Sequence, residues 1–191
     1  MDRNSVKWWG PIPAIVTPFD DRGAIDEKLL ARNIDILMSK GATGIVIGGC
    51  TGEFWAMSME ERIALFKMGV KAMAGRGFVI AGSGAVRVED AIMLTRAAHD
   101  AGCDGGLVLP PYFVKLSDDE IFAHYEALSK AVDGPVMLYN IPGNAVNVLP
   151  GPATAAKQPY NCESRSPGSC RSCVRGTIRG GNDATTARST S

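Results

Sequence analysis

The 191-residue sequence lacks the features that mark a nucleic-acid-binding or membrane protein. Its formal net charge is zero, it has no run of lysine and arginine, and aromatic residues make up 7% of it, so we expect no nucleic-acid partner. It also has no apolar stretch of the roughly 18 residues that a membrane-spanning helix needs. The charged segment 1–7 precedes no apolar signal core. We therefore expect a cytoplasmic protein with no membrane partner, whose ligand is a small molecule.

The numbers and spacing of cysteine and histidine favour neither a disulfide framework nor a histidine metal site. The five cysteines are an odd number, so we expect reduced thiols rather than the paired cysteines of a small secreted protein. His99 and His124 fall in expected helices without a partner at metal-ligand spacing, which favours structural or surface roles. The sequence therefore predicts no metal and no other cofactor.

Between residues 12 and 140, short apolar runs alternate with longer helical patterns, as in a chain of β/α units. Apolar runs of this kind suit strands that are covered on both faces. The strands are expected at 13–17, 44–48, 78–82, 106–110 and 135–140. Such units fit either a doubly wound sheet or the first part of a closed barrel, and the pattern alone does not choose between them.

The helices between these runs carry start and stop signals. Asp26 can cap the first, while Ser58 and Ser117 each begin a capping box for the second and the fourth. The third, at about 88–101, is stopped by Gly102. The residues expected to face the core are Leu30, Ile34, Leu37 and Met38 in the first helix, Met59, Ile63, Phe66, Val70 and Met73 in the second, and Ile121, Tyr125, Leu128 and Val132 in the fourth.

This organisation ends near residue 150. Segment 151–191 is rich in Ser, Thr, Arg, Gly and Cys, and it shows neither a strand nor an amphipathic helix pattern. Three interpretations stay open: a frameshifted or misread C-terminus, a natural disordered extension, and a metal-binding module. The last rests on Cys162, Cys170 and Cys173, which have no fourth ligand nearby. We therefore divide the chain into an organised domain at 1–150 and an irregular tail at 151–191.

The most informative motif is the glycine-rich segment 48–55, Gly-Gly-Cys-Thr-Gly-Glu-Phe-Trp, which follows the second expected strand. Glycines let main-chain N–H groups converge on an anion, and Thr51 adds a hydroxyl donor, so a carboxylate would suit this turn. The alternative is a tight connection whose glycines serve the turn alone.

A second motif, Tyr-Asn-Ile-Pro-Gly at 139–143, ends the fifth expected strand. The hydroxyl of Tyr139 can relay protons, because a phenol both donates and accepts, or it can satisfy a buried carbonyl. A third motif, Pro-Pro-Tyr-Phe at 110–113, ends the fourth expected strand, and packing alone accounts for it.

Together these segments resemble the dihydrodipicolinate synthase and N-acetylneuraminate lyase family over residues from about 9 to 150. The motifs that carry the resemblance are P-A-I-V-T-P-F at 13–19, G-C-T-G-E at 49–53, A-G-S-G at 81–84, P-P-Y at 110–112 and Y-N-I-P-G at 139–143. The resemblance implies an α/β fold, a (β/α)8 TIM barrel, here truncated after about five β/α units. It also implies a homo-tetramer and a cofactor-free lyase, in which a sixth-strand lysine forms a Schiff base with pyruvate or another 2-oxo acid.

The resemblance further implies roles for the first two motifs. Thr51 and Tyr139 would be the catalytic residues, with Tyr139 moving protons at the imine stage, and Glu53 would support the loop from beneath. The substrate carboxylate would be bound by the turn residues Gly49, Cys50, Thr51 and Gly52.

Three positions depart from the synthase of the lysine pathway. Cys50 stands where the synthase has a relay hydroxyl, and Phe113 stands where it has the relay tyrosine that crosses to a neighbouring subunit. Asn144 replaces an arginine that would bind a second carboxylate. A thiol, a phenyl and an amide cannot repeat that chemistry, which favours a sugar-acid dehydratase or aldolase over the lysine-pathway synthase.

The sixth-strand lysine is not found in the sequence. Lys157 is the only lysine beyond Lys130, and it lies in no apolar strand that could desolvate it. We therefore expect a chain that is inactive as written, with exposed sheet edges and poor solubility on its own. The alternative is a non-catalytic carboxylate-binding or subunit-interaction protein.

Overall fold

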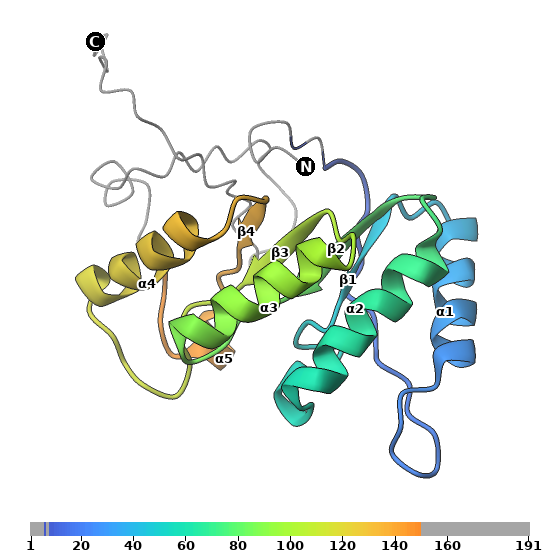
Figure 1. The fold of residues 1–191 in the computed structure, drawn as a ribbon, viewed down its shortest axis with the longest axis horizontal. Helices are drawn as coiled ribbons and strands as arrows, with labels where there is room; N and C mark the ends of the chain where they lie inside the picture. The colour runs from blue at the N-terminus through green and yellow to red at the C-terminus, as the bar shows by residue number, and fades with distance from the viewer. Residues whose placement is uncertain (1–5, 7, 150–191) are drawn as a thin grey trace, which may run out of the picture.

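The computed structural model describes residue 6 and residues 8–149, which form a parallel sheet with helices along one face (Figure 1). The strands are β1 Gly44–Ile47, β2 Phe78–Gly82, β3 Gly105–Val108 and β4 Val136–Leu138. The helices are α1 Glu27–Ser39, the 3-10 helix η1 Phe54–Ala56, α2 Met59–Met73, α3 Val88–Asp100, α4 Asp118–Ala131 and α5 Pro142–Ala145.

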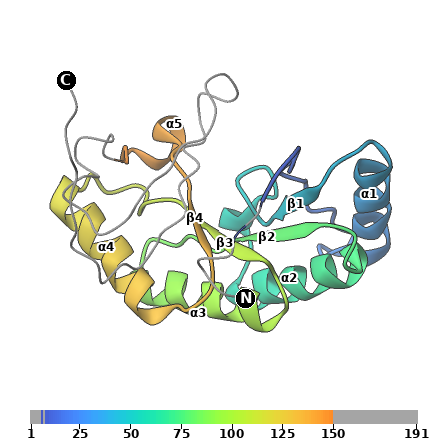
Figure 2. The same cartoon turned by 90° about the horizontal axis from the view of Figure 1, so that it is seen from above.

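The strand order distinguishes a barrel from a doubly wound sheet. The strands pair as β1-β2-β3-β4, each parallel to its neighbour and in sequence order. Seen from above, helices α1 to α4 follow one another around the same side of the sheet (Figure 2). A doubly wound sheet reverses its strand order and carries helices on both faces, so the arrangement is that of a TIM barrel and confirms the predicted fold class.

The first predicted strand, 13–17, is wrong as a strand. Its contact with the sheet is a single parallel bridge between Ala14 and Val46. The Ile15 N–H donates to the Val46 carbonyl at 3.0 Å, and the Val46 N–H donates to the Pro13 carbonyl at 2.8 Å. Pro13 and Pro18 have no N–H to extend this ladder. The described residues therefore form four strands beside an irregular edge segment, rather than five complete units.

The helix start signals are confirmed. The Asp26 carboxylate accepts a hydrogen bond from the Leu29 N–H, and Ser58 and Ser117 each begin a complete capping box. The third helix ends before Gly102, which has a positive φ of 94°. Such backbone is accessible to glycine at little cost, so the predicted stop is explained.

The predicted core face of α2 is displaced from the observed one. Met59, Ile63 and Val70 are half-buried and pack at the margin of the core, whereas Phe66 and Met73 are buried as expected. The fully inward positions also include Arg62, Leu65 and Gly69. A Cβ on Gly69 would lie 2.4 Å from Ile47 Cδ1, so this glycine lets the helix approach β1 closely. The apolar pattern did not predict this buried face, because the face contains a glycine and a charged residue.

The main core fills the space between the sheet and helices α1 to α3. Its buried members include Ile34, Ile45, Phe66 and Leu94, and a second cluster lies beneath α4 around Ile121 and Leu128. In the described part of the chain, no helix is long and apolar enough to cross a membrane. The predicted tail at 151–191 lies outside the described residues.

Candidate functional site

A small cavity of about 10 Å³ lies beyond the carboxyl ends of the strands, where parallel α/β barrels keep their active sites. Its volume is room for about one water molecule. The residues that line it come from the ends of all four strands and from η1: Gly48, Gly49, Cys50, Phe54, Gly82, Gly84, Leu107, Leu109 and Tyr139. The glycine-rich turn and the Tyr-Asn-Ile-Pro-Gly motif thus meet at one place.

Glycine is required where the ends of β1 and β2 approach each other. A Cβ added to Gly82 would lie 1.9 Å from the Gly48 carbonyl oxygen, and Gly48 itself has a positive φ of 61°. A Cβ on Gly84 would lie 2.3 Å from Leu109 Cδ2. The three glycines therefore let the main chain form the cavity wall directly.

Cys50 and Tyr139 contact each other across this cavity. The two side chains are hydrogen-bonded, and burial raises the pKa of the Cys50 thiol while this bond opposes the rise. Both residues are half-buried and pack against a cluster that contains Phe54, Leu109 and Ala145. The thiol is therefore neutral at physiological pH, and the phenol lies where it can exchange a proton with a ligand in the cavity.

The glycine-rich turn keeps two main-chain donors available. Its Gly52 N–H donates to the Gly49 carbonyl at 3.0 Å, and the Glu53 N–H donates to the Cys50 carbonyl at 3.1 Å. Within residues 8–149, the N–H groups of Cys50 and Thr51 donate to no main-chain carbonyl. Adjacent N–H groups that donate to no main-chain carbonyl can bind one carboxylate.

Thr51 and Gly52 belong to the turn but do not line the cavity. The Thr51 side chain is exposed, whereas Gly52 is buried. The buried Thr17 hydroxyl donates to the Gly52 carbonyl at 2.8 Å and holds the turn to the edge segment. The structure thus brings Gly49, Cys50 and Tyr139 together and leaves Thr51 at the rim.

Glu53 does not support the loop from beneath. It is exposed and has a positive φ of 58°, so it lies at the surface of the turn. Thr17 holds the turn instead. The Arg62 guanidinium lies over the Phe54 ring and donates to the carbonyls of Gly82 and Gly84, beyond the end of β2, at 2.6 and 2.9 Å. Sequence reasoning missed Arg62 because it interrupts the apolar stripe of α2.

Asn147 holds the third motif in place. Its amide group donates to the carbonyls of Pro111 and Val114 at 2.6 and 2.7 Å, and its oxygen accepts from the Leu116 N–H at 2.8 Å. Asn147 is 3% exposed; its bond to Pro111 is buried, and its bonds to Val114 and Leu116 are partly buried. No sequence pattern marks an asparagine that is used in this way.

Two of the positions that depart from the synthase lie at the surface. Phe113 is 85% exposed and has a positive φ of 71°, and its ring centroid lies 5.3 Å from that of Tyr112. Asn144 is exposed on α5. Neither lines the cavity, so both are open to a further chain or to a larger ligand.

A larger hollow of about 630 Å³ lies at the opposite, amino-terminal end of the strands. Its charged groups are already engaged: Arg76 pairs with Asp35 at 2.7 Å, and the Asp104 carboxylate accepts from the Val79 N–H at 2.8 Å. It contains no pair of groups comparable with Cys50 and Tyr139. The smaller cavity is therefore the better candidate, since the convergent chemical groups lie there.

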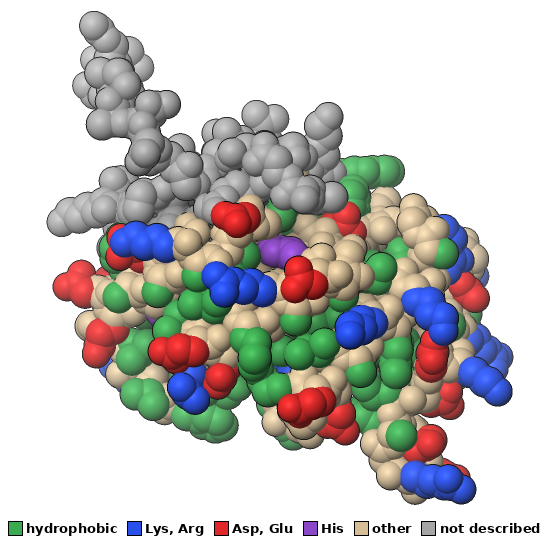
Figure 3. Space-filling view, viewed as in Figure 1, with side chains coloured by type: hydrophobic (Ala, Val, Ile, Leu, Met, Phe, Trp, Pro, Cys, Tyr) green, Lys and Arg blue, Asp and Glu red, His purple; other side chains and the backbone are tan. Residues whose placement is uncertain are grey.

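Charged side chains of both signs lie on the surface. On the face shown in Figure 3, acidic and basic side chains are interspersed. Within residues 8–149, no group of three His, Cys, Asp or Glu side chains could hold a metal ion. Cys162, Cys170 and Cys173, on which the metal-binding interpretation rests, lie outside the described residues.

Comparison with known proteins identifies the family of the chain. Residues 7–157 match the model of the dihydrodipicolinate synthetase family. The chain is 42% identical over 144 residues to a 4-hydroxy-tetrahydrodipicolinate synthase of Bacillus velezensis, covering 75% of this chain and 50% of the relative. It is 44% identical over 142 residues to the synthase of Persephonella marina, covering 74% and 48%. The chain spans about half the length of the curated relatives it matches.

Solved structures show the same similarity. Dihydrodipicolinate synthase of Acinetobacter baumannii, complexed with pyruvate, matches with a TM-score of 0.74 and 38% identity over 78% of this chain and 50% of that one. YagE of Escherichia coli K12, a family member also complexed with pyruvate, matches with a TM-score of 0.74 and 33% identity over 78% and 51%.

Proposed function

This chain belongs to the dihydrodipicolinate synthetase family, and on that premise we propose that it carries the carboxylate-binding and proton-transfer half of a 2-oxo-acid lyase site. The observation that supports this most directly is the meeting of Cys50 and Tyr139 beside the glycine-rich turn. Pyruvate is the ligand named for two of the matched structures, which supports a 2-oxo acid here.

The proposed roles follow from the available groups. The N–H groups of Cys50 and Thr51, with the Thr51 hydroxyl at the rim, would bind the substrate carboxylate. The Tyr139 hydroxyl would give and take the proton that moves as an imine and its enamine interconvert. The cavity has room for about one water molecule, so the acid would extend from it past the rim.

The imine itself needs an amine that the described residues do not bring to this site. None of the lysines within residues 8–149 lines the cavity. We therefore propose that this chain binds a 2-oxo acid without forming a Schiff base. One experiment can therefore distinguish the two hypotheses, a covalent lyase and a non-catalytic carboxylate-binding protein.

Pyruvate and borohydride would be added to the protein, and intact mass would report any trapped imine, while calorimetry measures binding. A family member that carries the lysine serves as the positive control for trapping. We expect binding at millimolar concentration or tighter without an adduct. A stoichiometric adduct would overturn the proposed inactivity, and the absence of any binding would overturn the site.

The substrate class is a proposal of its own. The thiol of Cys50 and the phenyl of Phe113 cannot form a hydroxyl relay, and Asn144 offers no guanidinium to a second carboxylate. These departures support a sugar acid over the aldehyde partner of the lysine-pathway synthase. Competition of 2-oxo sugar acids with pyruvate in the same calorimeter tests this choice, and failure of every sugar acid to compete would reject it.

A further inference from the structure

Arg62 contacts the candidate cavity from behind. The residue is 4% exposed on the inward face of α2. Its Nη2 donates to the carbonyls of Gly82 and Gly84, and its Cζ lies 4.9 Å from the centroid of the Phe54 ring. Gly82, Gly84 and Phe54 all line the cavity. A single side chain thus connects three parts of the cavity wall without reaching the cavity itself.

Burying the charge of Arg62 has a desolvation cost. Burial lowers its pKa to about 10, with Tyr112 and Asp90 acting in the opposite direction, so the guanidinium remains positive at neutral pH. Its Nε has no hydrogen-bond partner. None of the ion pairs found within residues 8–149 includes Arg62. An apolar side chain would fill this space without that desolvation cost, so packing alone does not explain the arginine.

We propose that Arg62 is a positioning residue that fixes the Gly82–Gly84 segment and Phe54 and supplies the positive potential that attracts an anionic substrate to the cavity. The inference rests on the proposed binding of a 2-oxo acid. A charge behind an apolar wall acts through a medium of low polarizability, so its influence on an anion is larger than the same charge would have in water. A neutral ligand of the same shape would not respond to it.

The test compares pyruvate with its uncharged methyl ester on the full chain. Calorimetry would measure both affinities for the unchanged protein, for Arg62→Lys and for Arg62→Met. We expect Arg62→Met to weaken pyruvate roughly tenfold and methyl pyruvate by less than about twofold, because only the acid is charged. Arg62→Lys should retain most of the preference for the acid. Arg96→Met is the matched control, since Arg96 donates to the Ala131 carbonyl on the exposed side and should leave both affinities unchanged.

The outcomes separate this inference from the proposed function. Equal weakening of both ligands by Arg62→Met would reduce the arginine to a structural role and overturn the inference. Unchanged pyruvate binding would do the same. If Arg62→Met does not fold, Arg62→Gln replaces it, and failure of both to fold would identify a folding residue and reject the proposal. No binding of pyruvate by the unchanged protein would overturn the proposed function together with this inference.

Discussion

The hydroxyl of Tyr139, which directly follows β4, is hydrogen-bonded to the thiol of Cys50, three residues beyond the end of β1. Two strands, β2 and β3, separate their strands in the sheet. In a flat sheet this spacing would hold β1 and β4 about 14 Å apart, beyond what the two side chains span. The contact across two intervening strands fits a sheet that curves toward closure, as the wall of a barrel does.

The same contact predicts the reactivity of Cys50. Burial raises the pKa of its thiol, so alkylation should reach half its maximal rate at a higher pH than for a free thiol, whose pKa is about 8.5. Tyr139→Phe removes a hydrogen bond that favours the thiolate and should move the profile further upward. Peptide mass spectrometry after timed alkylation measures this at Cys50 alone.

Two residues serve as controls for that experiment. Tyr112→Phe removes a phenol from the same cluster without breaking the bond to Cys50, so the profile should stay in place. Cys103 is buried, and its pKa is raised to about 12, so it should remain unlabelled while the protein is folded. A profile for Tyr139→Phe at or below that of the unchanged protein would contradict the hydrogen bond.

Much of the fold was predictable because local signals act within a few residues. Three helix ends were predicted from local signals: the capping boxes at Ser58 and Ser117 and the glycine at 102. The apolar runs predicted the positions of the four observed strands. The apolar composition of segment 13–17 predicted a strand, but the segment forms a single bridge. Its prolines have no N–H group to donate to the neighbouring strand, and apolar composition does not report this.

The position of the candidate site was predictable in part for the same reason. The glycine-rich turn and Tyr139 lie in short motifs at strand ends, and the topology brings strand ends together. Thr17, Arg62 and Asn147 act on main-chain groups 20 to 36 residues away in sequence. Such contacts depend on the register of packed elements, which no local pattern encodes.

Gly82→Ala should destabilise the protein by about 1–3 kcal/mol or more, because its Cβ would overlap the Gly48 carbonyl oxygen and force the ends of β1 and β2 apart. Urea unfolding measures the change. Gly143→Ala is the control: no atom lies within 4 Å of its added Cβ, so its effect should stay within about 0.5 kcal/mol. Equal stability of the two variants would show that β1 and β2 are not so close.

Asn147→Ala should cost about 1–3 kcal/mol, because it leaves the part-buried Leu116 N–H and two carbonyls without their partner. The loss should be local, so hydrogen exchange at the Leu116 amide should accelerate more than exchange in β2. Asn144→Ala, at an exposed position of α5, should change neither quantity. Unchanged protection of the Leu116 amide would exclude the proposed anchoring of the loop that carries Phe113.

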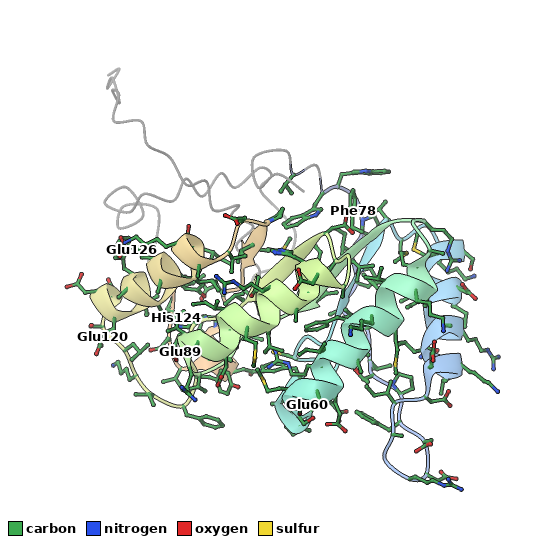
Figure 4. All side chains as sticks on the ribbon, viewed as in Figure 1. Glu60, Phe78, Glu89, Glu120, His124 and Glu126 are labelled. Carbon is green, nitrogen blue, oxygen red and sulfur yellow. The ribbon has the colours of Figure 1, made fainter. Side chains whose placement is uncertain are left out.

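The stability of the protein should fall as the pH drops below about 6.5, in part because of His124. This side chain lies on α4 close to Glu89 of α3 (Figure 4), is 8% exposed, and has no hydrogen-bond partner at Nε2. Burial lowers its pKa below the ordinary value, and Glu89 offsets part of that effect. Between the unfolded and folded pKa values the unfolded chain binds the proton and the folded chain does not, so acid favours unfolding.

His124→Phe removes this proton uptake and keeps a ring at the same place against Tyr125. Urea unfolding at pH 7.5 and 5.0 should therefore show a smaller loss of stability for the variant, by up to about 1.4 kcal/mol for each pH unit between the two pKa values. Some acid sensitivity should persist, because burial also lowers the pKa of His99, whose Nε2 lies 3.2 Å from the Pro135 carbonyl. If the variant loses as much stability as the unchanged protein, His124 takes up its proton as readily in the folded protein as in the unfolded chain, and its burial does not limit acid stability.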